Sequence, residues 1–183
     1  DFWHLRTITS TDGLGWSPAA NVALTQTDGS WDQAGIWSPA IVADGNRLRL
    51  WYAGSDGQTW AIGTATSRDG LQWEKYAGNP GLRGDVGAGW DRSGVAGPAV
   101  IVQPDGSYTL IYLGTGDGAT WRVGRAHSAD GLVWVKESEP VPDLGTHTLP
   151  GDVPPAAAAI LREGVYRLWL DQPPSTEEGQ HIG

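Results

Sequence analysis

The sequence predicts an all-β fold assembled from repeats, and three observations support this. The string S-x-D-G-L-x-W occurs three times, beginning at Ser10, Ser67 and Ser128. Its Asp-Gly pairs lie 57 and 61 residues apart, a period typical of repeat proteins. The 183 residues include 27 glycines, 12 prolines and 11 tryptophans, which imply many turns and many aromatic contacts. This composition favours short strands over helices.

The innermost strand of each repeat is indicated by a second recurring string. GSWDQAGIWSPAIV, from Gly29, is echoed by AGWDRSGVAGPAVI, from Ala88, with each Trp and each Pro 59 residues from its counterpart. A weaker third copy, GDVPPAAAAI, begins at Gly151. The runs AIVA, AVIV and AAAAIL at the ends of these strings are continuously apolar. We therefore expect these strands to be buried on both faces.

Two further strands follow in each repeat. NRLRLWYAG from Asn46, SYTLIYLG from Ser107 and VYRLWL from Val165 alternate in polarity, which predicts half-buried second strands. TWAIGTATS from Thr59 and TWRVGRAHS from Thr120 predict third strands. The turn signals ADGN, QPDG and REG separate the first strands from the second.

The S-x-D-G-L-x-W string itself lies where the third strand turns into a fourth. Asp-Gly is a strong hairpin signal, because Gly accepts positive φ and Asp bonds the turn backbone. A catalytic residue has no reason to recur in every repeat. We therefore predict a structural role for Asp12, Asp69 and Asp130.

Four strands in a unit of about 60 residues describe a blade of a β-propeller, with strands a to d running from axis to rim. The expected blades of this single domain, 1–183, are a half blade over 1–28, full blades over 29–87 and 88–146, and a half blade over 147–183. Closed propellers have about four to eight blades, so about three blades form a partial ring. We expect either a piece of a longer protein or a homo-oligomer whose copies close the ring.

Charge and composition exclude several classes of function. Twelve Lys and Arg against 21 Asp and Glu give a net charge of −9, which argues against nucleic acid and anionic membrane surfaces as partners. No apolar run approaches the ~20 residues of a membrane span. There is no cysteine, so a secreted and a cytoplasmic location are both left open. Because no nucleotide fingerprint, serine-hydrolase motif or metal-ligand spacing is present, we expect no cofactor and no metal site, and a calcium ion in the channel is the alternative left open.

Carbohydrate is the partner that the loop residues favour. The d–a and b–c loops of a propeller open on one face, and there Trp rings can stack on sugar C–H groups while carboxylates bind hydroxyls. Trp37 does not recur, since Ala96 takes its place, and His147 and Asp152 are also unique to one repeat. The Trp-Asp pairs do recur, and blade packing is their alternative role. The candidate substrate-binding residues are Trp31, Asp32, Trp37, Trp90, Asp91, His147 and Asp152.

The strings W-D-x-x-G-[IV]-x-x-P-[AS]-[IV], R-L-x-[LI]-[WY]-Y-x-G and I-G-x-A-x-S-x-D-G-L-x-W together resemble the furanosidase-type glycoside hydrolases. These are arabinanases, β-xylosidases, invertases and mannoside phosphorylases, and the resemblance covers essentially the whole chain. The sialidase Asp-box is a weaker match, because one residue separates its Asp from its Gly. The resemblance implies a propeller that hydrolyses a glycosidic bond with paired carboxylates and no cofactor.

The inner strands depart from that superfamily, in which catalytic carboxylates flank the proline of strand a. The positions before this proline hold Ser38, Gly97 and Pro154, and those after it hold Ala40, Ala99 and Ala156. A Glu-Gly-Pro-like string for the general acid is also absent from the sequence. Whether the chain is an enzyme is therefore open. The alternatives are a non-catalytic, lectin-like propeller and a propeller fragment that assembles into a ring by oligomerisation.

Overall fold

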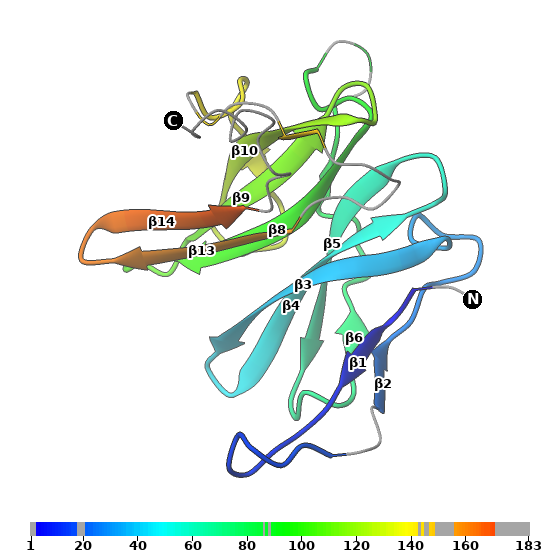
Figure 1. Ribbon diagram of the computed structural model, residues 1–183, viewed down its shortest axis with the longest axis vertical. Coiled ribbons are helices and arrows are strands. Elements are labelled where there is room, and N and C mark those ends of the chain that lie inside the picture. The colour runs from blue at the N-terminus through cyan, green and yellow to red at the C-terminus, as the bar shows by residue number, and fades with distance from the viewer. Residues whose placement is uncertain are drawn as a thin grey trace, which may run out of the picture.

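The all-β prediction is confirmed by a computed structural model, which describes residues 3–17, 21–85, 87, 89–142, 144, 147–148 and 156–170. These residues form 14 strands and no helix. Accordingly, no described helix is long and apolar enough to cross a membrane. Figure 1 shows two larger units of strands lying against one another, with a two-stranded unit at each end.

The first full blade is a regular antiparallel sheet whose strands follow the chain from the inside outward. Its strands are β3 (Gly35–Asp44), β4 (Arg47–Ser55), β5 (Trp60–Ser67), β6 (Glu74–Lys75) and β7 (Leu82–Arg83). The two short outer strands β6 and β7 both pair with β5, so together they form strand d.

The second full blade repeats this order, and half blades flank the pair. Its strands are β8 (Gly94–Val102), β9 (Tyr108–Thr115), β10 (Thr120–Ser128), β11 (Val135–Lys136) and β12 (His147–Thr148). The half blades are β1 (Leu5–Thr7) with β2 (Asn21–Leu24), and β13 (Ala157–Arg162) with β14 (Val165–Leu170). Because β12 pairs with β10, it lies in the second blade, just past the boundary expected after residue 146.

Neighbouring blades are joined at one recurring point. Trp60 at the start of β5 pairs in parallel with Gly94 at the start of β8, and Trp3 pairs with Gly35 in the same way. Gly94 has φ +152°, and a Cβ there would lie 2.9 Å from the backbone nitrogen of Trp60. The glycine at the start of strand a therefore allows the close approach of two blades.

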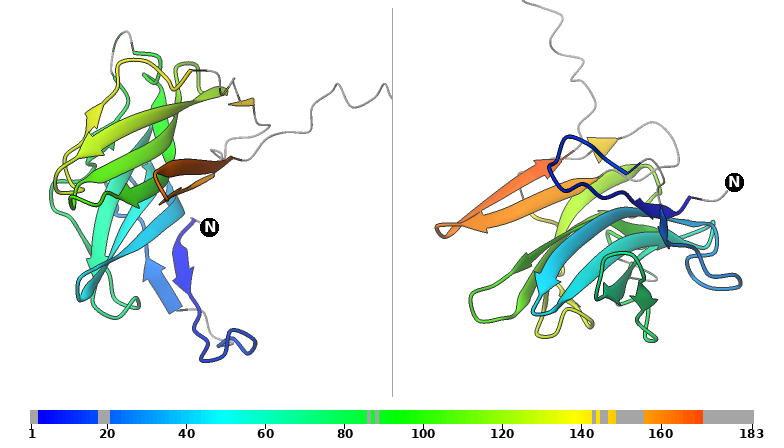
Figure 2. Two further views of the ribbon diagram at one scale, coloured as in Figure 1. Left: turned by 90° about the vertical axis from the view of Figure 1, so that its left-hand side faces the viewer. Right: turned by 90° about the horizontal axis from the view of Figure 1, so that it is seen from below.

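The core lies between the blades. Trp51 and Ile62 of the first blade pack against Leu110 and Tyr112 of the second. On the other side of the second blade, Leu113 belongs to a cluster that contacts the β13–β14 hairpin, and Figure 2 shows this hairpin on the side turned away from the first blade. The second blade is thus covered on both faces.

This cover corrects two expectations about burial. Strand β8 is buried from Gly94 to Ile101 as predicted, but β3 and β13 alternate, and Ile41 and Ile160 are 53% and 45% exposed. Conversely, β9 is buried throughout rather than half-buried. The reason is position. The β1–β2 half blade packs against strands b and c of the first blade and reaches strand a only near its start, whereas the second blade lies between the first blade and the a–b hairpin β13–β14.

The S-x-D-G-L-x-W turns have the predicted structural role. In the second copy, Asp69 Oδ1 accepts backbone N–H bonds from Leu71 at 2.8 Å and Gln72 at 2.9 Å, while the Gly70 N–H donates to Ser67 Oγ. The copies at Asp12 and Asp130 make the same bonds. The motif therefore builds the c–d turn in all three places.

Candidate functional site

The carboxylate of Asp32 lies inside the first blade. Its side chain is completely buried, and Lys75 Nζ from strand d lies 2.5 Å from Oδ2. The Tyr52 hydroxyl from strand b donates to the same oxygen at 3.2 Å, and the Thr27 N–H donates to Oδ1 at 3.1 Å. The carboxylate thus ties the d–a loop to two strands of its own blade.

Asp91 makes the same arrangement in the second blade. Lys136 Nζ lies 2.8 Å from Oδ2, and the Tyr112 hydroxyl donates to Oδ2 at 3.2 Å. Burial, and then the adjacent carboxylate, raise the pKa of Tyr52 and Tyr112, so both phenols remain hydrogen-bond donors. This recurring geometry gives Asp32 and Asp91 a structural role, and their contact with a sugar stays a prediction.

The recurring tryptophans of the d–a loops are partly buried against strands b and c. The Trp31 ring lies over Gly54 and Gly63, where an added Cβ would come within 2.5 Å of it. Trp90 lies over Gly114 in the same way and stacks with Tyr112 at a centroid distance of 5.9 Å. Both rings pack on strand b, and the Trp31 ring also on strand c, at the loop end of a blade, and only the part of each ring that is not buried there can contact a ligand.

Trp37 lies in a different setting, at the start of the innermost strand β3. Its ring is 4.6 Å from that of Trp60, edge-on, and 5.7 Å from that of Trp3, which is 60% exposed. The indole N–H of Trp37 is buried and has no acceptor among the described residues. Ala96 holds the equivalent place in the second blade, so the fold itself does not require this cluster of Trp3, Trp37 and Trp60, the tryptophan cluster.

A bulge follows Trp37 and recurs in the second blade. The register between β3 and β4 shifts between Trp37 and Ala40, and that between β8 and β9 shifts between Ala96 and Ala99. Ser38 has φ +48° at this bulge, a conformation uncommon for a residue other than glycine. Bulges next to functional sites re-aim side chains, and here they occur where the resemblance places catalytic carboxylates.

The remaining predicted residues are placed only in part. His147 pairs through its backbone with Trp121 as part of β12, and not in a loop as expected. Asp152 lies outside the described residues. Within the described part of the chain, no group of three His, Asp or Glu side chains could hold a metal ion.

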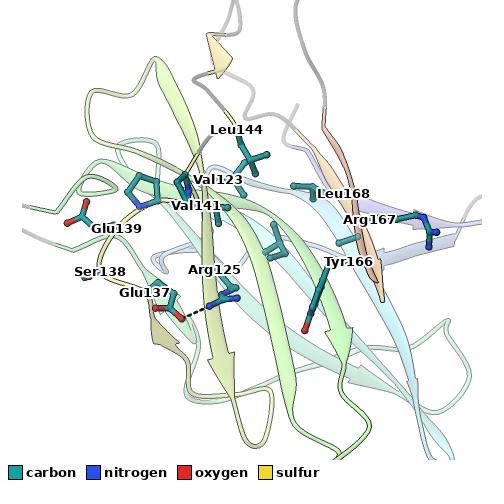
Figure 3. A pocket seen from close by; sticks show the side chains of 14 residues that line it. Val123, Arg125, Glu137, Ser138, Glu139, Val141, Leu144, Tyr166, Arg167 and Leu168 are labelled. Carbon is teal, nitrogen blue, oxygen red and sulfur yellow. Dashed lines mark hydrogen bonds and ion pairs between the residues drawn. The ribbon is translucent and has the colours of Figure 1, made fainter. Parts of the chain in front are cut away.

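An apolar groove of about 540 Å³ lies between the second blade and the β13–β14 hairpin (Figure 3). Ile111 and Val123 line it on one side and Leu168 on the other, while Arg125 and Glu137 form an ion pair at its edge. Between the two full blades, the corresponding space holds Ala126 and Trp134, from strand c and the start of strand d. The groove is therefore a packing surface for the outer half of a blade.

The sequence matches a known protein family over most of its length. The model of the glycosyl hydrolases family 32 N-terminal domain matches residues 2–150. The chain belongs to this family. The family 32 match spans both full blades, and it confirms the resemblance to furanosidase-type glycoside hydrolases.

Similar proteins are longer than this family 32 chain. An uncharacterized protein of Mycobacterium tuberculosis, MT1551, is 33% identical over 128 residues, which cover 65% of this chain and 38% of the relative. A putative glycoside hydrolase from Bacteroides ovatus is 26% identical with a TM-score of 0.52, over 58% of this chain and 31% of that one. Fructan 1-exohydrolase IIa from Cichorium intybus shares the fold, with a TM-score of 0.64 at 19% identity over 84% of this chain and 29% of that one.

Sequence reasoning missed two features of the site. It did not place Trp3 beside Trp37, although Trp3 and Trp60 start equivalent strands, and the inter-blade junction could have suggested the contact. It also overlooked Arg122, which stands where the first blade has Ala61. In both cases a position-by-position comparison of the repeats was the available signal.

Proposed function

We propose that this glycoside hydrolase-related chain binds carbohydrate through the tryptophan cluster. The observation that carries the proposal is Trp37, a tryptophan that the repeat does not need, at the inner end of strand a and between Trp3 and Trp60. Exposed indole surface fits the C–H face of a sugar. The buried, unsatisfied N–H of Trp37 would gain an acceptor if a hydroxyl reached it, and leaving such a group unsatisfied costs about 1–3 kcal/mol.

Hydrolysis is the second candidate, and membership of family 32 favours it. Paired-carboxylate hydrolysis needs an acid and a base or nucleophile about 5–10 Å apart. Ser38 and Gly97 hold the inner-strand positions in the full blades, while Asp32 and Asp91 are enclosed by lysine and tyrosine. The hydrolase hypothesis therefore requires carboxylates at other positions, and Asp152, which lies outside the described residues, is the candidate in this chain.

The partner that completes the ring is a further part of the proposal. The outer side of the last half blade exposes Ile160, Val165 and Trp169, at 45%, 51% and 54%. A terminal a–b pair, β13–β14, and a terminal c–d pair, β1–β2, are complementary halves of a blade. Two copies exchanging these halves would form a ring of about six blades, within the usual range.

The binding proposal is tested by calorimetric titration of the chain with neutral fructo- and arabino-oligosaccharides. Trp37→Ala should lower the affinity at least about tenfold, because it removes an aromatic contact whose burial contributes about 1.5–3 kcal/mol. Ala96 in the second blade indicates that the scaffold accepts alanine there. Trp16→Ala removes an exposed tryptophan from a c–d turn and should leave the affinity unchanged.

Equal affinity of the wild type and Trp37→Ala would contradict the proposal, as would no binding of either neutral sugar. The same mixtures, assayed for released monosaccharide, test hydrolysis separately. Release that Asp152→Asn abolishes would favour the hydrolase, whereas binding without release would favour the lectin-like alternative.

A further inference from the structure

A second hollow lies on the loop end of the second blade, the end at which Trp37 also lies. It has a volume of about 260 Å³ and combines cationic, polar and aromatic side chains. It is lined by Trp90, Arg92, Gly116, Asp117, Thr120 and Arg122. We refer to it as the arginine hollow.

The two arginines of this hollow are exposed and, in the described structure, make no ion pair. Arg49, Arg125 and Arg162 each lie against a carboxylate, whereas Arg92 and Arg122, like Arg47 and Arg68 of the first blade, do not within the described part of the chain. Asp117 is the one carboxylate among the lining residues, and its Oδ1 accepts the N–H groups of Ala119 and Thr120 at 2.9 and 2.7 Å. Two guanidinium groups are thus placed together in a chain whose net charge is −9.

The first blade shows that the fold does not require these cations. Gln33 stands at the position of Arg92, and Ala61 at that of Arg122, next to the equivalent tryptophans. The surrounding turns are otherwise alike, because Asp56 accepts the N–H groups of Gln58 and Thr59 as Asp117 does in the second blade. The positive charge at these two positions is therefore present in the second blade and absent from the first, although the two blades share the same backbone turns.

The b–c loop of the second blade is also one residue longer, and the extra residue is Gly116. Ser93 Oγ donates to the Gly116 carbonyl at 2.8 Å and holds the loop. A Cβ at this position would lie 2.8 Å from the Trp90 carbonyl oxygen and 3.6 Å from Arg92 Nη1. Because the inserted residue is glycine, the loop can approach the Trp90 backbone, and the Arg92 guanidinium can lie beside Gly116.

We propose that the arginine hollow binds the carboxylate of an acidic saccharide, a uronic acid residue within an oligosaccharide. Guanidinium groups pair with planar carboxylates through two parallel hydrogen bonds. The free edge of Trp90 supplies apolar surface for the sugar ring, and Asp117 and Thr120 supply partners for its hydroxyls. This inference rests on the proposed carbohydrate binding and specifies an acidic ligand for it.

The test compares digalacturonic acid with a neutral disaccharide of galactose by calorimetry at low ionic strength, where exposed charges are least screened. In the variant Arg92→Gln with Arg122→Ala, the hollow takes the side chains of the first blade. We expect affinity for digalacturonic acid to fall about tenfold or more, as the loss of two charge-assisted contacts implies. Binding of a neutral sugar should not change.

The matched control is Arg47→Ala with Arg68→Gln, which removes two exposed arginines from a hollow at the opposite, c–d turn end of the first blade. It makes the same change in net charge and should leave the affinity for digalacturonic acid unaltered. Equal losses in both double variants would overturn the proposal, since they would reveal a general charge effect.

Two further outcomes distinguish the failures. Binding of neutral oligosaccharides without preference for digalacturonic acid would overturn this inference and leave the proposed function standing. No binding of any saccharide would overturn both. Inorganic sulfate that competes as well as digalacturonic acid would also overturn the inference, because the site would then recognise an anion and not a sugar acid.

Discussion

Asp32 and Asp91 are the charged side chains that the described residues bury completely. Each is neutralised by a lysine from strand d and accepts a hydrogen bond from a tyrosine of strand b, so one carboxylate joins the d–a loop to two strands of its blade. Removing one partner of a buried ion pair leaves an uncompensated charge, which costs far more than removing both. We therefore expect the stability of each full blade to depend on its intact Asp–Lys–Tyr triad.

Lys75→Met should lower the free energy of unfolding by about 3–5 kcal/mol, because Asp32 would remain charged and buried. Adding Asp32→Asn to this variant should restore at least half of the loss. Urea denaturation followed by tryptophan fluorescence measures both. If the single and double variants are equally unstable, the loss arises from side-chain packing, and the ion-pair explanation is wrong.

The turn aspartates predict how stability responds to acid. Backbone N–H groups, that of Gln72 first, lower the pKa of Asp69. Its folded pKa therefore lies below the unfolded value of about 3.9, so its stabilisation is present above that pH and is lost as the pH falls through the folded pKa. Thermal midpoints between about pH 2 and 6 should fall less steeply for Asp69→Asn than for the wild type.

At the scale of the element, the junction between blades depends on a tryptophan at the start of strand c and a glycine at the start of strand a. Trp60 and Gly94 form one junction, and Trp3 and Gly35 the other. Two hydrogen bonds also join the blades at the opposite end, where the Arg49 side chain donates to the Asp130 carbonyl and the Trp51 indole donates to the Gly131 carbonyl. The Asp130-Gly131 turn therefore closes its own c–d hairpin and also accepts hydrogen bonds from the neighbouring blade.

Gly94→Ala tests the junction. The new methyl group would lie 2.9 Å from the Trp60 backbone at a positive φ, so both crowding and backbone strain oppose it. Gly106→Ala is the matched control, because Gly106 also has positive φ but nothing lies within 4 Å of its Cβ position. In urea denaturation, Gly94→Ala should lose at least about 2 kcal/mol more than Gly106→Ala, the cost typical of overpacking. Equal losses would show that φ alone matters.

At the scale of the whole molecule, the described blades form an open arrangement with apolar surface at its end. Trp169 is 54% exposed on the last half blade, whereas Trp51 on the equivalent strand of the first blade is completely buried by the second blade. Exposed apolar patches and unpaired strand edges favour association. The relatives are more than twice as long as the matched region, so further blades in the same protein are the other source of cover.

Light scattering on a sizing column distinguishes these two sources of cover. The chain has a mass of 19.4 kDa, and exchange of half blades predicts a discrete species of twice that mass. Trp169→Ser should shift this species towards the monomer, since it removes apolar surface from the interface. A wild-type chain that runs as a monomer would contradict the oligomer proposal.

The sequence by itself determined the local chemistry of this protein. The repeat period, the order of the strands and the Ser-x-Asp-Gly turns follow from side chains that act within a few residues of one another, so they could be predicted. Trp37 could be selected as a candidate because it breaks the repeat. Tertiary structure decided the burial of β9, the enclosure of Asp32 by Lys75, and the placement of Arg92 and Arg122 at one hollow. These depend on which blade lies beside which, and on contacts between residues far apart in the chain, which a periodic pattern does not specify.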